Sequence, residues 1–307
     1  MSNNFEVVCF GDINLDYIGK VDRVPEKDEE VPLEDLKTFS GGAGTNVAVA
    51  LARLGSKVAF IGSIGDDSIG NNLLKEISLE GVDTSHVVIK KGYGTGIVFS
   101  IVDNEGERRL LTYSDANLQT KENDFSEKFI KKAKILHMSS PYLPVVPYLI
   151  NIAKKNNLIV SFDPGTLISR YGIDKIKSIL ANVDILFLNT VEYQQFTGSS
   201  NLNNLDLFIE LGCKMIIYKQ GKKGSLIHTS RGTEVFMPSF SVKAIDSTGA
   251  GDAFAGAFLH GYIRNYATEE LMKFSSAVAA LSIMQKGAKE GLPKAKEVQT
   301  FLKNHTS

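Results

Sequence analysis

The chain has 307 residues, 43% of them hydrophobic and 22% charged, and its 34 basic and 35 acidic residues leave a formal net charge of −1. These values are typical of a globular domain and provide no basic excess that would hold nucleic acid or an anionic membrane. No window is apolar enough for a membrane span and the N-terminus lacks a secretion signal, so we expect a cytoplasmic protein without membrane partners.

Short apolar strands alternate with helical patterns along most of the chain. Strands are predicted over 7–10, 58–61, 135–138, 158–162, 185–188 and 215–218. Helices are predicted over 46–54, 69–80, 146–156, 173–181, 191–197, 275–284 and 296–302. This alternation is typical of an α/β fold with a mostly parallel sheet covered on both faces.

Two segments break the alternation. Residues 15–38 are polar and extended, and residues 96–113 form a predicted hairpin. We expect these two segments to form a small β lid, whereas residues 1–14, 39–95 and 114–307 form an α/β catalytic domain. The alternative is that they extend an edge of the main sheet.

Cys9 and Cys213 both lie in apolar stretches. Two cysteines exclude a disulfide framework, so buried thiols are expected. The chain has no Cys-x-x-Cys or His-x-x-x-His spacing, which argues against a zinc site built by the protein.

A run of small residues followed by an acid is the most informative motif. Gly249, Ala250 and Gly251 precede Asp252, and an apolar helical pattern follows. Free backbone N–H groups at a helix start form an anion site. A carboxylate beside bound phosphate is repelled unless it has a role, and the natural role is to accept a proton from a hydroxyl that attacks phosphorus. The alternative is an ordinary helix cap after a glycine turn.

A second constellation combines a glycine-rich turn with amides and a carboxylate. Residues 40–46 read Ser-Gly-Gly-Ala-Gly-Thr-Asn, so Gly42 permits close backbone approach and Asn46 offers a donor and an acceptor. Asn14 and Asp16 follow the first strand, at the sheet edge where open α/β folds bind ligands. Together these side chains suit the hydroxyl groups of a polyol.

Two other nucleotide-binding motifs are excluded. The Gly-x-Gly runs at 42–47 and 249–254 have Val47 and Phe254 where a dinucleotide fingerprint needs a small residue. The chain also lacks Gly-x-x-x-x-Gly-Lys-Ser/Thr, so no P-loop is present.

Four ordered motifs resemble those of the ribokinase family of sugar kinases, also called the phosphofructokinase B family. Residues 41–46 and 246–252 resemble its N-terminal and C-terminal signatures. Residues 189–192 resemble its Asn-x-x-Glu motif, and residues 219–224 resemble its glycine motif on the nucleotide side. The resemblance covers nearly the whole chain and implies a ribokinase-like three-layer α/β/α fold.

The resemblance implies ATP-dependent phosphorylation of a hydroxymethyl group of a small sugar. Asp252 would be the catalytic base, and the backbone N–H groups of Gly249, Ala250, Gly251 and Asp252 would form the anion hole. The substrate-binding residues implied in the same way are Asn14, Asp16, Gly42 and Asn46.

The resemblance also implies a nucleotide site and two cations. Its nucleotide-binding residues would be Asn189, Lys219, Gly221 and Gly224. Glu192 would help to position Mg²⁺ through water, and Asp246 and Thr248 match positions that bind K⁺ in some members.

The acceptor is left open by departures from the family pattern. Ribokinases have a glutamate where this chain has Ser139, and residues 161–165 resemble archaeal nucleoside kinases. Ribose, fructose and ketodeoxysugars are therefore the expected acceptors, and the alternative is a nucleoside whose base would stack on Phe99 or Tyr113. A non-catalytic sugar sensor is a third reading. The exposed lid predicts a homodimer.

Overall fold

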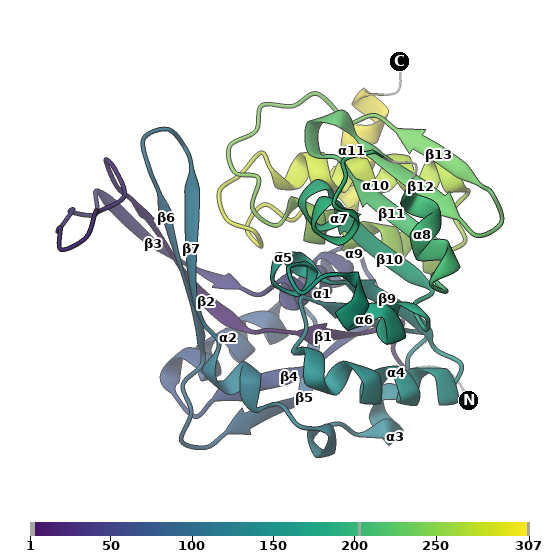
Figure 1. Ribbon diagram of the computed structural model, residues 1–307, viewed down its shortest axis with the longest axis horizontal. Coiled ribbons are helices and arrows are strands. Elements are labelled where there is room, and N and C mark those ends of the chain that lie inside the picture. Colours follow the sequence, from purple (N-terminus) through teal and green to yellow (C-terminus); the bar gives the residue numbers. More distant parts are fainter. Residues whose placement is uncertain (1–3, 202–203, 306–307) are drawn as a thin grey trace.

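The computed structural model describes residues 4–201 and 204–305 and contains a large sheet, a small sheet and helices (Figure 1). The large sheet has nine strands in the order β13-β12-β11-β10-β9-β8-β1-β4-β5. Its parallel strands are β1 (Val7–Gly11), β4 (Val58–Gly65), β5 (Asp83–Lys90), β8 (Ile135–Ser139), β9 (Ile159–Asp163), β10 (Ile185–Asn189) and β11 (Met215–Lys219). The antiparallel strands at one edge are β12 (Ser225–Thr229) and β13 (Glu234–Met237).

Helices cover both faces of this sheet because successive side chains of each central strand are apolar and point to opposite faces. Val7 and Cys9 pack with one group of helices: α1 (Ala43–Arg53), α2 (Ser68–Leu79), α9 (Ala250–Ile263), α10 (Thr268–Ser282) and α11 (Ala295–Asn304). Val8 and Phe10 pack on the opposite face with the other group: α3 (Glu127–Ile130), α4 (Val146–Lys155), α5 (Gly165–Ser169), α6 (Ile173–Leu180), α7 (Thr190–Thr197) and α8 (Leu205–Glu210). The predicted three-layer α/β/α fold with a mostly parallel sheet is confirmed.

Three strands, the short helices α3, α5 and α8, and several helix starts differ from the prediction. Strands β5, β12 and β13 were missed because they lie at or near the sheet edges, where polar side chains interrupt the apolar pattern. Helix α10 begins at Thr268 instead of Ser275, since its first turn is polar. Cys9 and Cys213 are both buried free thiols, as predicted.

The small sheet projects from the body, on the left of Figure 1. Its order is β3 (Asp35–Gly41), β2 (Asn14–Lys20), β6 (Gly96–Val102) and β7 (Arg108–Tyr113). Strands β2 and β6 are parallel, and each pairs antiparallel with its outer neighbour. These segments therefore form a separate sheet instead of an edge of the large one. That this sheet acts as a lid over a catalytic domain with the boundaries given above stays a prediction.

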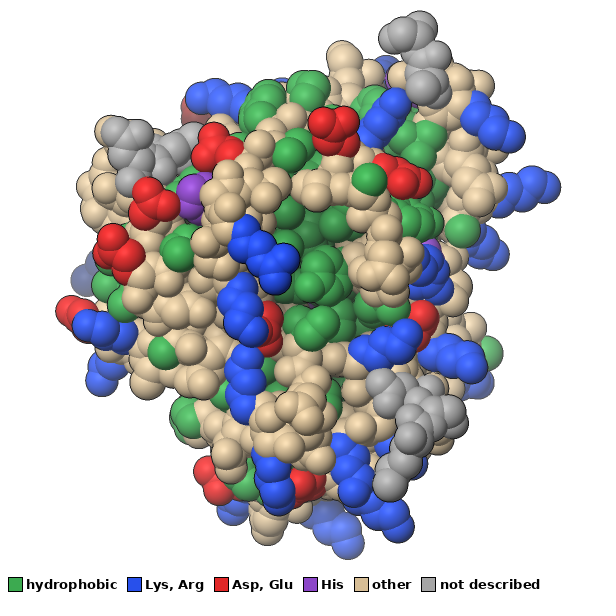
Figure 2. All heavy atoms as spheres, turned by 90° about the vertical axis from the view of Figure 1, so that its right-hand side faces the viewer, with side chains coloured by type: hydrophobic (Ala, Val, Ile, Leu, Met, Phe, Trp, Pro, Cys, Tyr) green, Lys and Arg blue, Asp and Glu red, His purple; other side chains and the backbone are tan. Residues whose placement is uncertain are grey.

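The face on the right of Figure 1, away from the small sheet, is distinguished by its side-chain types. Figure 2 shows hydrophobic side chains gathered in its centre, with Lys and Arg side chains around them. None of the helices over the described residues has both the length and the hydropathy that a membrane crossing requires.

Candidate active site

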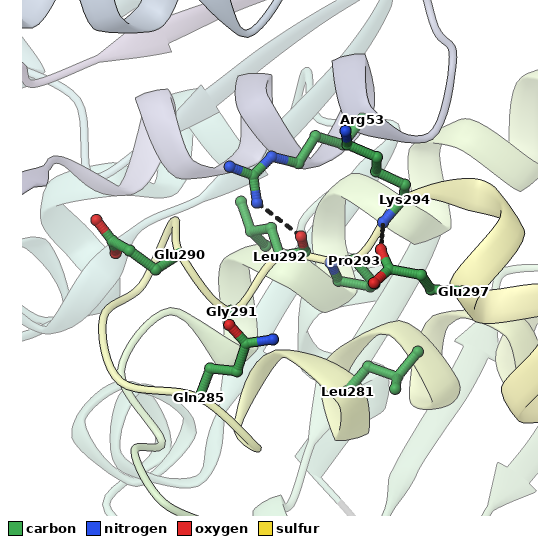
Figure 3. Close-up of a pocket in the computed structure, with 9 residues that line it drawn as sticks. All are labelled: Arg53, Leu281, Gln285, Glu290, Gly291, Leu292, Pro293, Lys294 and Glu297. Carbon is green, nitrogen blue, oxygen red and sulfur yellow. Dashed lines mark hydrogen bonds between the residues drawn. The ribbon is translucent and has the colours of Figure 1, made fainter.

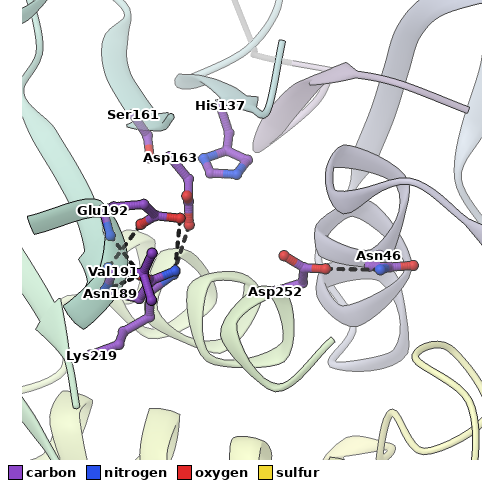
Figure 4. A network of polar contacts seen from close by, with 9 residues as sticks. All are labelled: Asn46, His137, Ser161, Asp163, Asn189, Val191, Glu192, Lys219 and Asp252. Carbon is purple, nitrogen blue, oxygen red and sulfur yellow. Dashed lines mark hydrogen bonds and ion pairs between the residues drawn. The ribbon is translucent and has the colours of Figure 1, made fainter. Parts of the chain in front are cut away.

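Predicted site residues and Asp163, which was not predicted, lie at the carboxyl ends of the parallel strands. Asp163, Asn189 and Lys219 are the last residues of β9, β10 and β11, and Asn189 pairs directly with Lys219 across the sheet. Helix α9 approaches the same edge with its N-terminus. Figure 4 shows Asp252 of this helix facing Asn46 of α1. This is the edge at which open α/β sheets bind their ligands.

The start of α9 leaves backbone donors free. Gly249 has φ 77° and ψ 0°, which is the left-handed conformation that glycine adopts without strain. The first i→i−4 bond is donated by Ala253 to Gly249 O at 2.8 Å, so the N–H groups of Gly251 and Asp252 precede it. The helix begins at Ala250, which places Asp252 inside the first turn; the predicted start after Asp252 is wrong because small residues conceal the helical pattern.

Asp252 is a half-buried carboxylate with one defined partner. Its Oδ2 accepts a hydrogen bond from Asn46 Nδ2 at 2.8 Å (Figure 4). The surrounding protein excludes water from Asp252 and raises the pKa of its carboxyl to about 7, although the bond from Asn46 opposes this shift. Asp252 thus exchanges a proton near neutral pH.

A buried ion pair lies beside this group. Lys219 Nζ contacts Asp163 Oδ2 at 2.7 Å. Burial alone would lower the pKa of Lys219, but the carboxylates of Asp163 and Glu192 raise it above its ordinary value. A Cβ added at Gly251 would lie 3.3 Å from Lys219 Nζ, so the ammonium reaches the first turn of α9. The structure therefore brings a fixed cation to the anion site that the sequence predicts.

Asn189 and Glu192 form a capping box at the start of α7. Asn189 Oδ1 accepts from the N–H groups of Val191 and Glu192 at 2.9 and 3.0 Å. The Glu192 carboxylate accepts from Asn189 N at 2.8 Å and from Asn189 Nδ2 at 2.7 Å. Burial, together with the nearby Asp163 carboxylate, raises the pKa of Glu192 well above its usual range. The Asn-x-x-Glu motif thus has a complete structural role of its own.

Gly221 and Gly224 form the turn between β11 and β12. Their φ angles are 56° and 114°, and Gln220 N donates to Gly224 O at 2.8 Å. A Cβ at Gly224 would lie 2.2 Å from Met237 O, so only glycine fits there. This turn follows Lys219 directly, which places it at the same edge of the sheet.

Asp16 of β2 lies where the small sheet meets the body. A Cβ at Gly41 would lie 2.2 Å from Asp16 Oδ1, so glycine makes room for this carboxylate. Asp16 Oδ1 and Asn46 Oδ1 are both buried without a hydrogen-bond partner. Burial raises the pKa of Asp16 to about 6, and Lys289 and Arg108 oppose the shift. Two unsatisfied buried acceptors are what a hydroxyl-rich ligand would satisfy.

Two other predicted substrate residues serve the local structure. Asn14 Oδ1 accepts from Asn117 Nδ2 at 2.9 Å, which ties β2 to the 3-10 helix at Asp115–Gln119. Gly42 precedes α1 with φ 102°, and a Cβ there would lie 2.1 Å from Asp12 O. Asn14 thus anchors β2, and Gly42 forms the turn into α1, the helix that carries Asn46.

Asp246 and Thr248 tie three segments together. The Asp246 carboxylate accepts from Thr248 N at 2.9 Å and from Gly287 N at 3.0 Å. The Thr248 hydroxyl oxygen accepts from Arg108 Nη1 at 3.0 Å. The loop before the anion site is therefore held by the loop after α10 and by strand β7 of the small sheet.

Four residues of the site were missed in the sequence: Asp163, Asn117, Arg108 and Lys289. The position of Asp163 at the end of a predicted strand was a usable signal, as it was for Asn14 and Asp16. Arg108 lies in the predicted lid hairpin, where nothing in the local pattern marks it, and Asn117 and Lys289 lie in segments that no sequence pattern connects to the site. Their roles depend on tertiary contacts.

A separate hollow of about 240 Å³ lies beside the loop after α10 (Figure 3). Its lining includes Arg53, Glu290, Leu292 and Glu297 but none of the residues drawn in Figure 4. Among the described residues no group of three or more His, Cys, Asp or Glu side chains is arranged to hold a metal ion.

Comparison with known proteins gives a consistent picture. A family model described as "pfkB family carbohydrate kinase" matches residues 4–295. An ATP-dependent ribose-1-phosphate kinase of Halopiger xanaduensis is 31% identical over 96% of this chain and 97% of its own. A 5-dehydro-2-deoxygluconokinase of Clostridium tetani is 31% identical over 89% and 87%. The crystal structure of a ribokinase of Thermotoga maritima has a TM-score of 0.87 and 30% identity, covering 98% of this chain and all of that one.

Proposed function

The chain belongs to the pfkB family of carbohydrate kinases, and we propose that Asp252 is the base that activates a sugar hydroxymethyl group for phosphorylation by ATP. The observation that supports this proposal is the position of Asp252. Its carboxyl has a pKa of about 7 and stands in the first helical turn, beside backbone N–H groups that precede the first intrahelical bond. A proton acceptor and an anion site are thus adjacent in a single turn of chain.

Each step of the proposed phosphoryl transfer can be assigned to a group of the protein. An oxygen lone pair of the acceptor attacks the γ-phosphorus, the bond from phosphorus to the ADP oxygen breaks, and the acceptor proton passes to Asp252. The hydrogen bond from Asn46 fixes the carboxylate, so the reacting groups are positioned in advance. The N–H groups at the start of α9 receive the charge on the transferred group.

We assign Asn189, Lys219, Gly221 and Gly224 to the nucleotide side. The Lys219 ammonium reaches Gly251, which supports a role in neutralising phosphate charge. The turn that contains Gly221 and Gly224 and the capping box of Asn189 lie at the ends of adjacent strands.

The donor set fits a magnesium ion that is held mostly by nucleotide phosphates. Mg²⁺ in such sites takes one or two carboxylates and keeps several waters. Each Glu192 oxygen accepts one bond from Asn189 and keeps a further lone pair, so Glu192 would hold the ion through water. When bound, the ion neutralises phosphate charge.

A potassium site at Asp246 and Thr248 fits only in part. Both oxygens of the Asp246 carboxylate keep a lone pair beyond their backbone bonds. The Thr248 hydroxyl oxygen already accepts from Arg108, a cation that would repel K⁺. We therefore retain Asp246 and the backbone of Thr248 as the proposed ligands, without the hydroxyl.

The unpartnered oxygens of Asp16 and Asn46 favour a sugar as the acceptor. The relatives act, by their names, on ribose 1-phosphate, 5-dehydro-2-deoxygluconate and ribose, and their similar identities select none of these. The alternative of a nucleoside gains no support from Phe99. It stacks on Tyr17 at 4.9 Å, and the strand register places this pair on the face of the small sheet opposite Asp16.

We also propose a cytoplasmic homodimer that pairs through the small sheet. Leu36, Leu111 and Tyr113 of this sheet are each more than half exposed, and the strand register places them on one face, whereas the exposed Leu110 lies on the other. Apolar side chains in that number on one small sheet are typical of an association surface. A monomer mass by light scattering at micromolar concentration would contradict the dimer.

A panel of acceptors with ATP and Mg²⁺ tests the function. It should contain D-ribose, D-fructose, ribose 1-phosphate, 5-dehydro-2-deoxygluconate and ribonucleosides, with ADP release as the readout. Turnover of a sugar that depends on Asp252 supports the proposal. Sugar binding without any ADP release would instead support a sensor.

A further inference from the structure

Lys289 is a buried ammonium without an ion-pair partner. The residue is 6% exposed, and its Nζ donates to Ser40 Oγ at 2.7 Å. No carboxylate of the described residues lies within 4.0 Å of this nitrogen. An ammonium has three donors, and burial of a charge is costly unless it is paired.

The surrounding acidic residues do not fully offset the free-energy cost of burying the Lys289 ammonium. The carboxylates of Asp16, Glu76, Glu290 and Asp252 all act on Lys289 at longer range and favour its charged form. Burial outweighs them and lowers the pKa of Lys289 to about 8. With a pKa of about 8 the ammonium is mostly charged at pH 7, and the four carboxylates compensate for that charge only in part.

Arg108 is a second cation without a carboxylate partner. Its guanidinium reaches from β7 to the Thr248 hydroxyl, and within residues 4–201 and 204–305 it forms no ion pair. Its neighbour Arg109 points to the other face of the strand and pairs with Asp103 at 2.7 Å. The positive charges of Arg108 and Lys289, from segments far apart in the chain, both lower the pKa of Asp16.

The position of Lys289 is fixed by its loop. Arg53 Nη1 donates to the carbonyls of Lys289 and Leu292, each at 2.7 Å. Figure 3 shows Arg53 reaching from α1 to this loop. The same guanidinium pairs with both oxygens of Glu80, at 2.8 and 2.6 Å. This clamp fixes the backbone of Lys289, and the bond to Ser40 Oγ orients its ammonium.

We propose that the acceptor sugar carries an anionic group, a phosphate or a carboxylate, and that Lys289 and Arg108 bind it. This inference rests on the proposed function, because it assigns the acceptor to the space beside Asp16. An anion there would give the buried ammonium its missing partner. Bound hydroxyl groups of the same sugar would satisfy Asp16 and Asn46.

The test compares acceptors that differ in charge. Dissociation constants of D-ribose, ribose 1-phosphate and 5-dehydro-2-deoxygluconate are measured by calorimetry without ATP, and KM and kcat are then measured with ATP. We expect one of the two anionic sugars to bind at least tenfold more tightly than ribose, since a hydrogen bond between charged groups contributes about 1.5–3 kcal/mol. The two anionic sugars distinguish a phosphate from a carboxylate.

Substitutions then locate the effect. Lys289→Met should reduce the preference for the anionic sugar over ribose by about tenfold and leave KM for ATP within twofold, and Lys289→Arg should restore part of it. Arg108→Met should act in the same direction. Lys286→Met in the same loop and Arg109→Met on the same strand are matched controls with the same change in charge, and neither should alter the preference. Circular dichroism and thermal unfolding confirm that each variant folds.

Equal affinity for charged and neutral sugars would overturn the inference while sugar phosphorylation by the protein still stands. A Lys289→Met variant that raises KM for ATP, and not for the acceptor, would also overturn it and assign the cation to the nucleotide. Tight, Lys289-dependent binding of an anionic sugar without ADP release would support the inference and count against the proposed function.

Discussion

The segments at residues 189–192 and 246–252 both resemble family motifs, but they differ in how their polar groups are satisfied. In the first, Asn189 and Glu192 bond to each other and to the start of α7, so both side chains have partners within the motif itself. In the second, the helix start leaves N–H groups ahead of the first intrahelical bond, and Asp252 has a pKa far above its usual value. Only the second arrangement lacks a structural explanation, so function is best sought there.

The largest expected effect belongs to Asp252. Asp252→Asn keeps an oxygen that accepts from Asn46 but removes the base, so kcat should fall by about 10²–10⁴-fold while sugar affinity changes little. Steady-state kinetics and calorimetry measure both quantities. A kcat close to that of the wild type would show that Asp252 is not the base. It would also contradict the functional difference inferred between residues 246–252 and 189–192.

The pH dependence gives the next largest effect. The base must be ionised, and burial holds the pKa of Asp252 at about 7, so kcat should fall about tenfold per unit as pH decreases below 7. A kcat that stays constant down to pH 5 would contradict this. The same shift has a stability consequence: between pH 4 and 7 this carboxyl ionises first in the unfolded chain, so the contribution of Asp252 to the free energy of unfolding decreases as pH rises. Asp252→Asn should therefore unfold at a higher temperature than the wild type at pH 8 and at the same temperature at pH 4.

Gly41→Ala tests whether Asp16 binds the acceptor sugar. The new Cβ would lie 2.2 Å from Asp16 Oδ1, so the carboxylate must turn away. We expect the acceptor KM to rise about tenfold, the effect of losing a hydrogen bond to a charged group, while KM for ATP stays constant. Gly19→Ala on the same sheet is the control, because its Cβ meets only the flexible end of Leu33. Equal effects of both substitutions would show a general disturbance of the sheet.

The smallest effect concerns the capping box. Glu192→Ala should lower the free energy of unfolding by about 1 kcal/mol, because the N–H of Asn189 loses its acceptor. Glu192→Gln keeps one acceptor oxygen and should retain most of that stability. If Glu192→Gln also raises the Mg²⁺ concentration needed for half-maximal rate, the carboxylate has a role beyond the cap. An unchanged Mg²⁺ requirement would limit this residue to the capping box.

The alternation of apolar strands and helices predicted the α/β layers, because burial on both faces of a parallel sheet demands that pattern locally. The helix start at Ala250 and the edge strands were not predictable in the same way, since small or polar residues conceal them. Asp252, Asn46 and Asp16 could be selected from the sequence because their neighbours in the chain are glycines and strand ends.

The sequence alone determined the order of most central elements and the residue types that bear the chemistry. Only the tertiary structure decided which of them meet: the bond between Asn46 and Asp252 joins residues 206 positions apart. It also brought Arg108 and Lys289 within electrostatic reach of Asp16 and raised the pKa of Asp252. Contacts between distant segments and exclusion of water from a carboxylate depend on how the layers pack, and no local pattern records them.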